Sequence, residues 1–469
     1  MSSENPATPV DISQSVRRGR ARRRTLAVLF AVSFVACTGD ATVSCSPSLT
    51  CDYKPAAFDA PPRPDAGPPV CDETRRRCSA ATIAAGGAHT CAVAEAGEVL
   101  CWGSNAHGQR GPLPPADVDA GAFAEFSSPL TDGVEIAAGG AHTCALNAEQ
   151  QVVCWGSDEA GQVDGRPSAD SAEVRLSGVE AMGVASAIAA GDAHSCAVVG
   201  GLVVCWGSNE YGQRDPRPDA SVDGIAVLDT AMEAVEVVAG ARHSCARFVD
   251  GHVDCWGTLL DAAGHWTRVS APTRVPGIDS AAALTAGGAQ TCARLLDRSV
   301  VCWGANESGQ LGDGTTTSSS APVVVRGIPL ALYVATGGAV GADGSATGHT
   351  CVVDKDFYVL CWGENGHGEL GTGPGPDRAT PGRVLAAPGR MPMGPLEPTG
   401  PTDLEGIIAL SAGAHHACAI SDRGRASCWG DDSEGQLDSV VTPTPMDFGR
   451  AVDVPRFSRQ RGDGPPPGP

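Results

Sequence analysis

The sequence predicts an all-β, seven-bladed β-propeller, and three observations lead to this fold class. The stretch GGAHTCAVAEAGEVLCWGSNAHGQ, residues 86–109, returns in six further variants. The copies recur at intervals of roughly 47 to 67 residues, which is long for a solenoid repeat and suits a multi-stranded unit repeated around an axis. Glycine contributes 60 residues whereas Phe, Trp and Tyr reach only 4%, a composition that favours turns and disfavours a helical bundle.

Each copy predicts a β-hairpin followed by further strands. In the first copy, short β-prone runs at residues 89–93 and 99–102 flank a polar turn that contains Gly97. Between one Trp-Gly pair and the next hairpin, a proline-containing link leads into a further apolar strand, as at residues 322–328. About four short strands per copy correspond to one propeller blade.

The end of the chain predicts how the ring closes. Residues 443–456 repeat the linking strand with no hairpin after it, and the first hairpin has no such strand before it. We therefore expect this C-terminal strand to return and complete the first blade, which would remove an open sheet edge.

The two cysteines of each copy are expected to form a cross-strand disulfide. Directly opposed residues of an antiparallel hairpin point to the same side, with Cα atoms roughly 4.5 to 5.5 Å apart, a separation that a disulfide accepts. Reduced core cysteines and zinc binding are the alternatives. The pairs are Cys91 and Cys101, Cys144 and Cys154, Cys196 and Cys205, Cys245 and Cys255, Cys292 and Cys302, Cys351 and Cys361, and Cys418 and Cys428.

The N-terminal residues 1–36 predict a signal peptide. Six arginines precede an apolar run, residues 26–36, which is too short to span a bilayer and has the length of a signal core. Cys37 follows Val35-Ala36, and this resembles the lipobox of bacterial lipoproteins, which implies lipidation of Cys37. The protein is then expected to be exported and anchored at the cell envelope or outer surface, with soluble secretion as the alternative.

Three segments follow the signal peptide. Residues 37–78 are expected to form a proline-rich tether, residues 79–458 the propeller, and residues 459–469 a disordered tail. The pairing of four tether cysteines is left open: Cys45, Cys51, Cys71 and Cys78. Within the propeller, residues 373–401 are too rich in proline and glycine to be a strand throughout and are expected to form a surface loop of open role.

Histidine and tryptophan recur at fixed positions in the copies. Because every blade needs them whatever its loop sequence, we expect Trp to pack blade against blade and His to be a hydrogen-bonding strut between blades. Gln290 replaces His in the fifth copy, which argues against a ring of metal ligands. The residues are Trp102, Trp155, Trp206, Trp256, Trp303, Trp362 and Trp429, and His89, His142, His194, His243, His349 and His415 or His416.

Residues 303–315, and less fully residues 362–371, closely resemble the RCC1 (regulator of chromosome condensation) repeat. With the A-G-x-x-H-T/S-C-A runs, the likeness covers about 380 residues. The resemblance implies a seven-bladed β-propeller that presents loops. The founder of the family is a guanine-nucleotide exchange factor that binds chromatin, and secreted relatives are binding proteins, among them an inhibitor of β-lactamases.

The leading functional hypothesis is an exported, surface-anchored scaffold that binds a protein or an extracellular polymer through the variable loops after each Trp-Gly. The net charge of −21 disfavours nucleic acid, and membrane contact is expected only through the lipid anchor. The protein is expected to be a monomer without cofactor, metal or catalytic residues, because no catalytic motif is found. A polysaccharide-active hydrolase or lyase is one alternative, and an exchange-factor-like regulator, if the protein is cytosolic, is another. The candidate loop residues are Asn105, His107, Asp158, Glu159, Asn209, Glu210, Tyr211, Asn306 and Glu307.

Overall fold

The chain divides into two units, Met1–Cys78 and Ser79–Pro469. The computed structural model describes residues 82–437 of the second unit, with gaps of which the longest are 112–125, 168–176, 179–183, 218–223 and 387–401, together with residues 452–453. The predicted signal peptide, Cys37, the tether and the C-terminal tail lie outside the described residues. Within the described ranges, no helix has the length and apolar character needed to cross a membrane.

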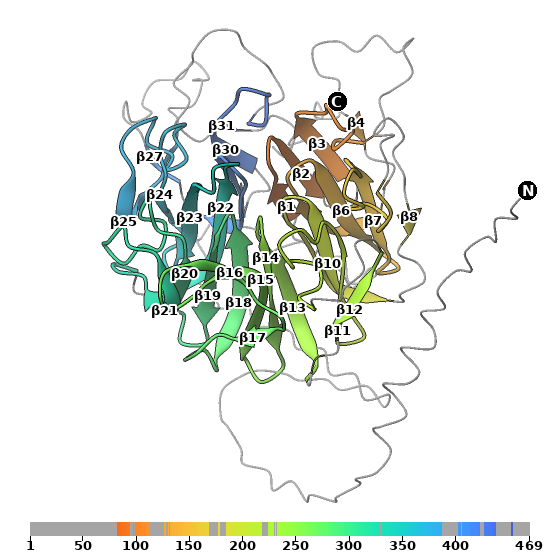
Figure 1. Ribbon diagram of the computed structural model, residues 1–469. Coiled ribbons are helices and arrows are strands. Elements are labelled where there is room, and N and C mark those ends of the chain that lie inside the picture. The colour runs from red at the N-terminus through yellow and green to blue at the C-terminus, as the bar shows by residue number, and fades with distance from the viewer. Residues whose placement is uncertain are drawn as a thin grey trace, which may run out of the picture. The chain divides into compact units, whose positions relative to one another are not determined.

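The second unit is a seven-bladed, all-β propeller, as predicted (Figure 1). Each blade is an antiparallel sheet, and the first strands of neighbouring blades contact each other all the way around the ring. These first strands are β1 (Thr82–Ala85), β5 (Gly133–Ala138), β9 (Ala185–Ala190), β13 (Ala234–Ala239), β18 (Ala281–Gly287), β22 (Ala331–Val340) and β28 (Ile407–Ala412).

The remaining strands of each blade follow in chain order. The second strands are β2 (His89–Val93), β6 (His142–Asn147), β10 (His194–Val199), β14 (His243–Phe248), β19 (Gln290–Leu295), β23 (Ala346–Asp354) and β29 (His416–Ser421). The third strands are β3 (Val99–Gly103), β7 (Val152–Gly156), β11 (Leu202–Gly207), β15 (Val253–Leu260), β20 (Val300–Gly304), β24 (Val359–Gly363) and β30 (Ala426–Gly430). The fourth strands are β4 (Phe126–Ser127), β8 (Ser177–Gly178), β12 (Ala226–Leu228), β17 (Thr273–Arg274), β21 (Ser319–Val324), β25 (Arg378–Arg383) and β31 (Val452–Asp453).

The cysteines of each copy lie directly opposite each other on the second and third strands. The register places Cys91 against Cys101, and in the third blade it places Cys196 against Cys205 across a turn that is one residue shorter. All seven pairs expected from the sequence form disulfides in the structure, with Cα atoms 4.0 to 4.1 Å apart. Each blade therefore has one covalent link between its two middle strands.

The expected closure through the first blade is wrong. The C-terminal strand β31 pairs with β30, so it completes the seventh blade, and the first blade has its own fourth strand, β4. The reason is that each link between hairpins contains two strands, the outer strand of one blade and the inner strand of the next, where the sequence pattern indicated one. The ring closes instead through contacts between blades 7 and 1, where Ile83 and Trp102 share a core cluster with Ile420 and Trp102 Nε1 donates to the main-chain oxygen of Gln436.

The expected surface loop at residues 373–401 also needs correction. Its residues Arg378–Arg383 form β25, the outer strand of the sixth blade. Two further short strands, β26 (Leu385–Ala386) and β27 (Thr402–Asp403), pair with each other, and residues 387–401 between them lie outside the described residues. Pro381 and Gly382 within β25 concealed this strand. An outer strand tolerates proline because it needs hydrogen bonds on one side only.

A hydrogen-bond relay joins each blade to the next and confirms the strut role of the histidines. His89 Nε2 lies 2.9 Å from Thr143 Oγ1, and this hydroxyl donates to the main-chain oxygen of Gln109 at 2.8 Å. Because the hydroxyl proton goes to the carbonyl, the hydroxyl oxygen accepts from His89. The same contact joins His142 to Ser195, His194 to Ser244, His243 to Thr291 and His416 to Thr90. In the fifth blade, Gln290 Nε2 donates to Thr350 Oγ1 at 3.1 Å.

The relay is broken between blades 6 and 7, where Ala417 stands at the position of the hydroxyl residue. Among the described residues, neither ring nitrogen of the buried His349 has a hydrogen-bond partner. An unsatisfied buried polar group costs roughly 1 to 3 kcal/mol. The sixth junction therefore lacks the side-chain hydrogen bond that the other six junctions have.

Restoring this hydroxyl should stabilise the protein. We expect Ala417→Ser to raise the free energy of unfolding by about 1 kcal/mol, because Ser195 and Ser244 fill the equivalent position in other blades. Urea denaturation followed by circular dichroism measures the change. The matched control is Thr143→Ala, which deletes the same hydroxyl in blade 2 and should lower stability by a similar amount. A lower midpoint for Ala417→Ser would contradict the assignment.

Candidate functional site

The loops that follow each Trp-Gly lie on one face of the ring, here called the loop face. The register sets His89 opposite Gly103, so the turn before each second strand and the loop after each third strand are at the same end of the blade. A shared frame holds these loops. In the first, Asn105 Oδ1 accepts from the N–H of Arg110 at 2.9 Å, and Gln109 Oε1 accepts from the N–H of His107 at 2.8 Å.

Four of the predicted binding residues belong to this frame. Asp158 and Asn306 are buried, and their side-chain oxygens accept from main-chain N–H groups five residues further along, as do those of Asn105 and Asn209. Their polar atoms stabilise the loop that carries them. The members of the predicted set with side chains at the surface are His107, Glu159, Glu210, Tyr211 and Glu307.

The fourth blade departs from the frame. After Trp256-Gly257, strand β15 continues to Leu260 and returns as β16 (Trp266–Arg268), so a hairpin replaces the loop with its Gly-Gln pair. This hairpin contacts the loop that follows Trp206-Gly207 in blade 3, because Thr258 Oγ1 donates to the main-chain oxygen of Tyr211 at 3.3 Å. The carbonyl that the Gly-Gln pair provides at other junctions is therefore missing between blades 4 and 5.

Two hydrogen-bond donors of blade 5 depend on that carbonyl. At five other junctions one Gln carbonyl accepts both from the hydroxyl of the relay and from a Trp Nε1, as Gln109 does from Thr143 and Trp155. The equivalent residues here are Thr291 and Trp303. In the described part of the chain, no carbonyl accepts a hydrogen bond from either of them, although Thr291 Oγ1 keeps its contact of 2.7 Å with His243.

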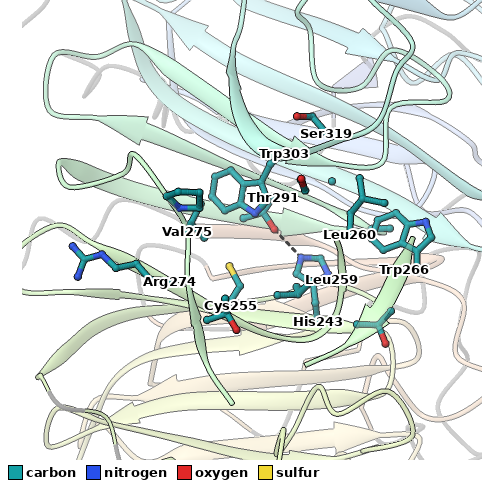
Figure 2. Close-up of a pocket in the computed structure, with 16 residues that line it drawn as sticks. His243, Cys255, Leu259, Leu260, Trp266, Arg274, Val275, Thr291, Trp303 and Ser319 are labelled. Carbon is teal, nitrogen blue, oxygen red and sulfur yellow. Dashed lines mark hydrogen bonds between the residues drawn. The ribbon is translucent and has the colours of Figure 1, made fainter. Parts of the chain in front are cut away.

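A pocket of about 110 Å³ lies at this position (Figure 2). Figure 2 shows Trp303 beside Thr291, with the Thr291–His243 hydrogen bond beneath them and Leu260 and Trp266 on the opposite side. Trp266 is 38% exposed, which is unusual for so large an apolar side chain in this molecule. The pocket thus combines two donors at its base with an apolar wall, and it suits a hydrogen-bond acceptor carried by an apolar group.

The sixth blade adds a second hairpin to the loop face. Strands β22 and β23 extend to Val340 and Ala346, beyond the length of their counterparts. The tip reaches the fourth blade, because Arg242 donates to the main-chain oxygen of Gly341 at 3.2 Å. Arg242 also lies over the ring of Tyr211, 4.4 Å from its centroid. Both hairpins and Tyr211 are thus near one another on this face.

The sequence contains signals for both hairpins that the repeat pattern obscured. The fourth copy has Thr258-Leu259-Leu260 where other copies have the polar loop, and the sixth has an insertion of glycine-rich residues before His349. Both departures from the repeat are visible in the sequence. The donors that the fourth-blade hairpin leaves without an acceptor, Thr291 and Trp303, belong to the fifth blade and are visible only in the structure.

Comparison with known proteins assigns the class of these repeats. Residues 80–109, 134–162 and 407–436 match one family profile of the Regulator of chromosome condensation (RCC1) repeat, and residues 299–341 match a second. These four segments therefore match the RCC1 repeat, in agreement with the resemblance predicted from the sequence.

Similar proteins share the repeat across very different sizes. The chain is 30% identical over 261 residues to the human E3 ubiquitin-protein ligase HERC2, covering 52% of this chain but only 5% of HERC2. It is 26% identical over 370 residues to the Ultraviolet-B receptor UVR8 of Arabidopsis thaliana, covering 76% of this chain and 78% of the receptor.

Solved structures support the fold. Yeast RCC1 (Prp20), solved bound to Kap60, has a TM-score of 0.57 and 20% identity, covering 76% of this chain and 83% of its own. Human WBSCR16 has a TM-score of 0.57 and 18% identity, covering 76% and 93%. At this identity the likeness concerns the fold alone.

Proposed function

We propose that this protein is a non-catalytic binding scaffold that holds a partner protein on its loop face, with the pocket between blades 4 and 5 as the anchor. The observation that carries the proposal is the pair of donors, Thr291 Oγ1 and Trp303 Nε1, at the base of an apolar pocket. A main-chain carbonyl of a partner loop would complete the relay in the same way as Gln109 does within the chain. Trp266 would then cover the inserted residue.

We further propose that the scaffold is exported and anchored through Cys37. Seven disulfides support export, because such bonds form and persist in oxidising compartments. In fractionated cells, the wild-type protein should be in the membrane fraction and Cys37→Ala in the soluble exported fraction. Membrane association of Cys37→Ala would contradict lipid anchoring, and a cytosolic wild-type protein would contradict export.

Partner capture tests the anchor. We expect immobilised wild-type protein to retain a partner protein from envelope extracts, and Trp266→Ala and Trp303→Phe to retain it at least 10-fold less, since each loses an apolar cover or a donor. Leu296→Ala is the control, because Leu296 is 72% exposed beyond the opposite end of its strand. Equal capture by all variants would place binding elsewhere, and retention of glycan without protein would favour a polymer ligand.

A ligand-free measurement checks the donor assignment. Trp206 Nε1 donates to the main-chain oxygen of Gln162 at 2.8 Å, whereas Trp303 Nε1 has no such acceptor in the described chain. Trp206→Phe should therefore lower the free energy of unfolding by about 1 kcal/mol more than Trp303→Phe. Equal losses would show that Trp303 already has an acceptor of similar value.

A further inference from the structure

Two histidines and two glutamates meet between blades 6 and 7 on the loop face. Glu364, His367 and Glu369 come from the loop after β24, and His415 comes from the turn before β29. One ligand-type atom from each residue lies within 4.8 Å of all the others. Residues about 50 positions apart in the sequence thus converge on one point.

The repeat pattern does not require these residues. Glu369 stands where five other copies have Gln, and His415 stands where most copies have Ala. Glu369 Oε2 makes the same hydrogen bond as the glutamine oxygen in the other copies, because it accepts from the N–H of His367 at 2.9 Å. Its second oxygen replaces an amide N–H₂ group and faces His367 Nδ1 at 3.1 Å and His415 Nδ1 at 3.6 Å.

The exchange of an amide for a carboxylate leaves the charges unbalanced. In blade 7 the equivalent Gln436 donates from Nε2 to the carboxylate of Asp431 at 2.9 Å. In blade 6 the residue at the position of Asp431 is Glu364. The carboxylates of Glu364 and Glu369 therefore lie where blade 7 has one carboxylate and one amide. The Glu369 side chain is fully buried. Among the described residues, the buried atoms Glu364 Oε2 and His415 Nδ1 have no hydrogen-bond partner, and they lie 3.7 Å apart.

The distances suit one small cation between the four side chains. Bonds of 2.0 to 2.2 Å from zinc to histidine nitrogen or carboxylate oxygen place tetrahedral ligands about 3.3 Å apart. Three of the separations between ligand atoms, at 3.1, 3.6 and 3.7 Å, are close to that value, and all are within 4.8 Å. Imidazole and carboxylate ligands together favour zinc over magnesium or calcium, which prefer oxygen alone. We propose that Glu364, His367, Glu369 and His415 form a zinc site that links blades 6 and 7.

The charge of the cluster agrees with a bound cation. Two carboxylates, Glu364 and Glu369, lie in it, and the Glu369 side chain is fully buried. A divalent cation would neutralise both glutamates and would strengthen the junction that Ala417 leaves without its relay.

Zinc titration of the untagged full chain tests the site. After removal of metals with a chelator, isothermal titration with ZnCl₂ should show one zinc per chain, and zinc should raise Tm. Glu369→Gln, which restores the residue of the other copies, should weaken zinc binding by roughly 100-fold or more and abolish the rise in Tm. Glu307→Gln, an exposed carboxylate in the blade 5 loop, should bind zinc like the wild type.

Three outcomes would overturn the proposal. No binding of zinc by the wild type would leave the cluster as a histidine–carboxylate ion network. Equal binding by Glu369→Gln would place any zinc elsewhere. Tighter binding of CaCl₂ than of ZnCl₂ would exclude the histidines as ligands.

Discussion

Mild acid is expected to destabilise the propeller strongly, because six buried histidines do not take up protons in the folded state at that pH. Burial lowers their pKa to about 3 for His89, His194 and His416 and to about 4 for His142, His243 and His349. In the unfolded chain a histidine has a pKa of about 6.5. The stabilising effect is thus fully present above pH 6.5 and is lost as the pH falls toward the folded values.

The expected size is large. At pH 5.5 each histidine removes roughly 1.4 kcal/mol of stability, so the six together remove up to roughly 8 kcal/mol, against a typical total of about 5 to 15 kcal/mol. Glu135 opposes them, because burial raises its pKa to about 7 and the folded carboxyl gains a proton over the same range. It offsets roughly one histidine. We expect an apparent Tm about 10 °C lower at pH 5.5 than at pH 7.5, measured by calorimetry.

The fifth blade supplies the control for the acid experiment. His142→Gln copies the natural Gln290, which bridges blades without a titratable group. This variant should fold, and its loss of stability between pH 7.5 and pH 5.5 should be smaller by about one sixth. A Tm that stays constant over this range would show that the histidines keep a normal pKa in the folded protein.

Reduction of the seven disulfides is expected to prevent folding. Each closes a hairpin loop of about ten residues, which contributes roughly 2 to 3 kcal/mol by restricting the unfolded chain. Even with partial additivity, the sum exceeds the net stability of a typical domain. Protein that is reduced in denaturant and diluted into reducing buffer should therefore lack the β-sheet circular dichroism of the oxidised protein.

A single disulfide should matter much less than all seven. The double variant Cys91→Ala, Cys101→Ala should retain the fold and lose roughly 2 to 3 kcal/mol, because the ring contacts of blade 1 remain. Non-reducing mass spectrometry should find the two cysteines of each copy linked in the wild-type protein. Native-like circular dichroism and an unchanged Tm after complete reduction would show that the bonds are dispensable.

The features shared by all copies could be predicted from the sequence, because they are local to one hairpin. Opposed cysteines follow from the period of two in a strand, and a position where Gln290 can replace His indicates a hydrogen bond instead of a metal ligand. The propeller itself follows from seven such units, since one blade cannot bury its faces alone.

Only the tertiary structure decided what happens between blades. The missing acceptor of Thr291 and Trp303 and the meeting of Glu364 with His415 each involve residues of two neighbouring blades. The pairing of β31 with β30 within blade 7 is likewise visible only in the structure. The repeat pattern predicts contacts within one blade. The carbonyl missing from blade 4 and the carboxylate of Glu369 in blade 6 instead change the contacts with the next blade. For this reason the sequence alone determined the ring and its covalent links, and the structure determined which junctions lack hydrogen bonds that the others have.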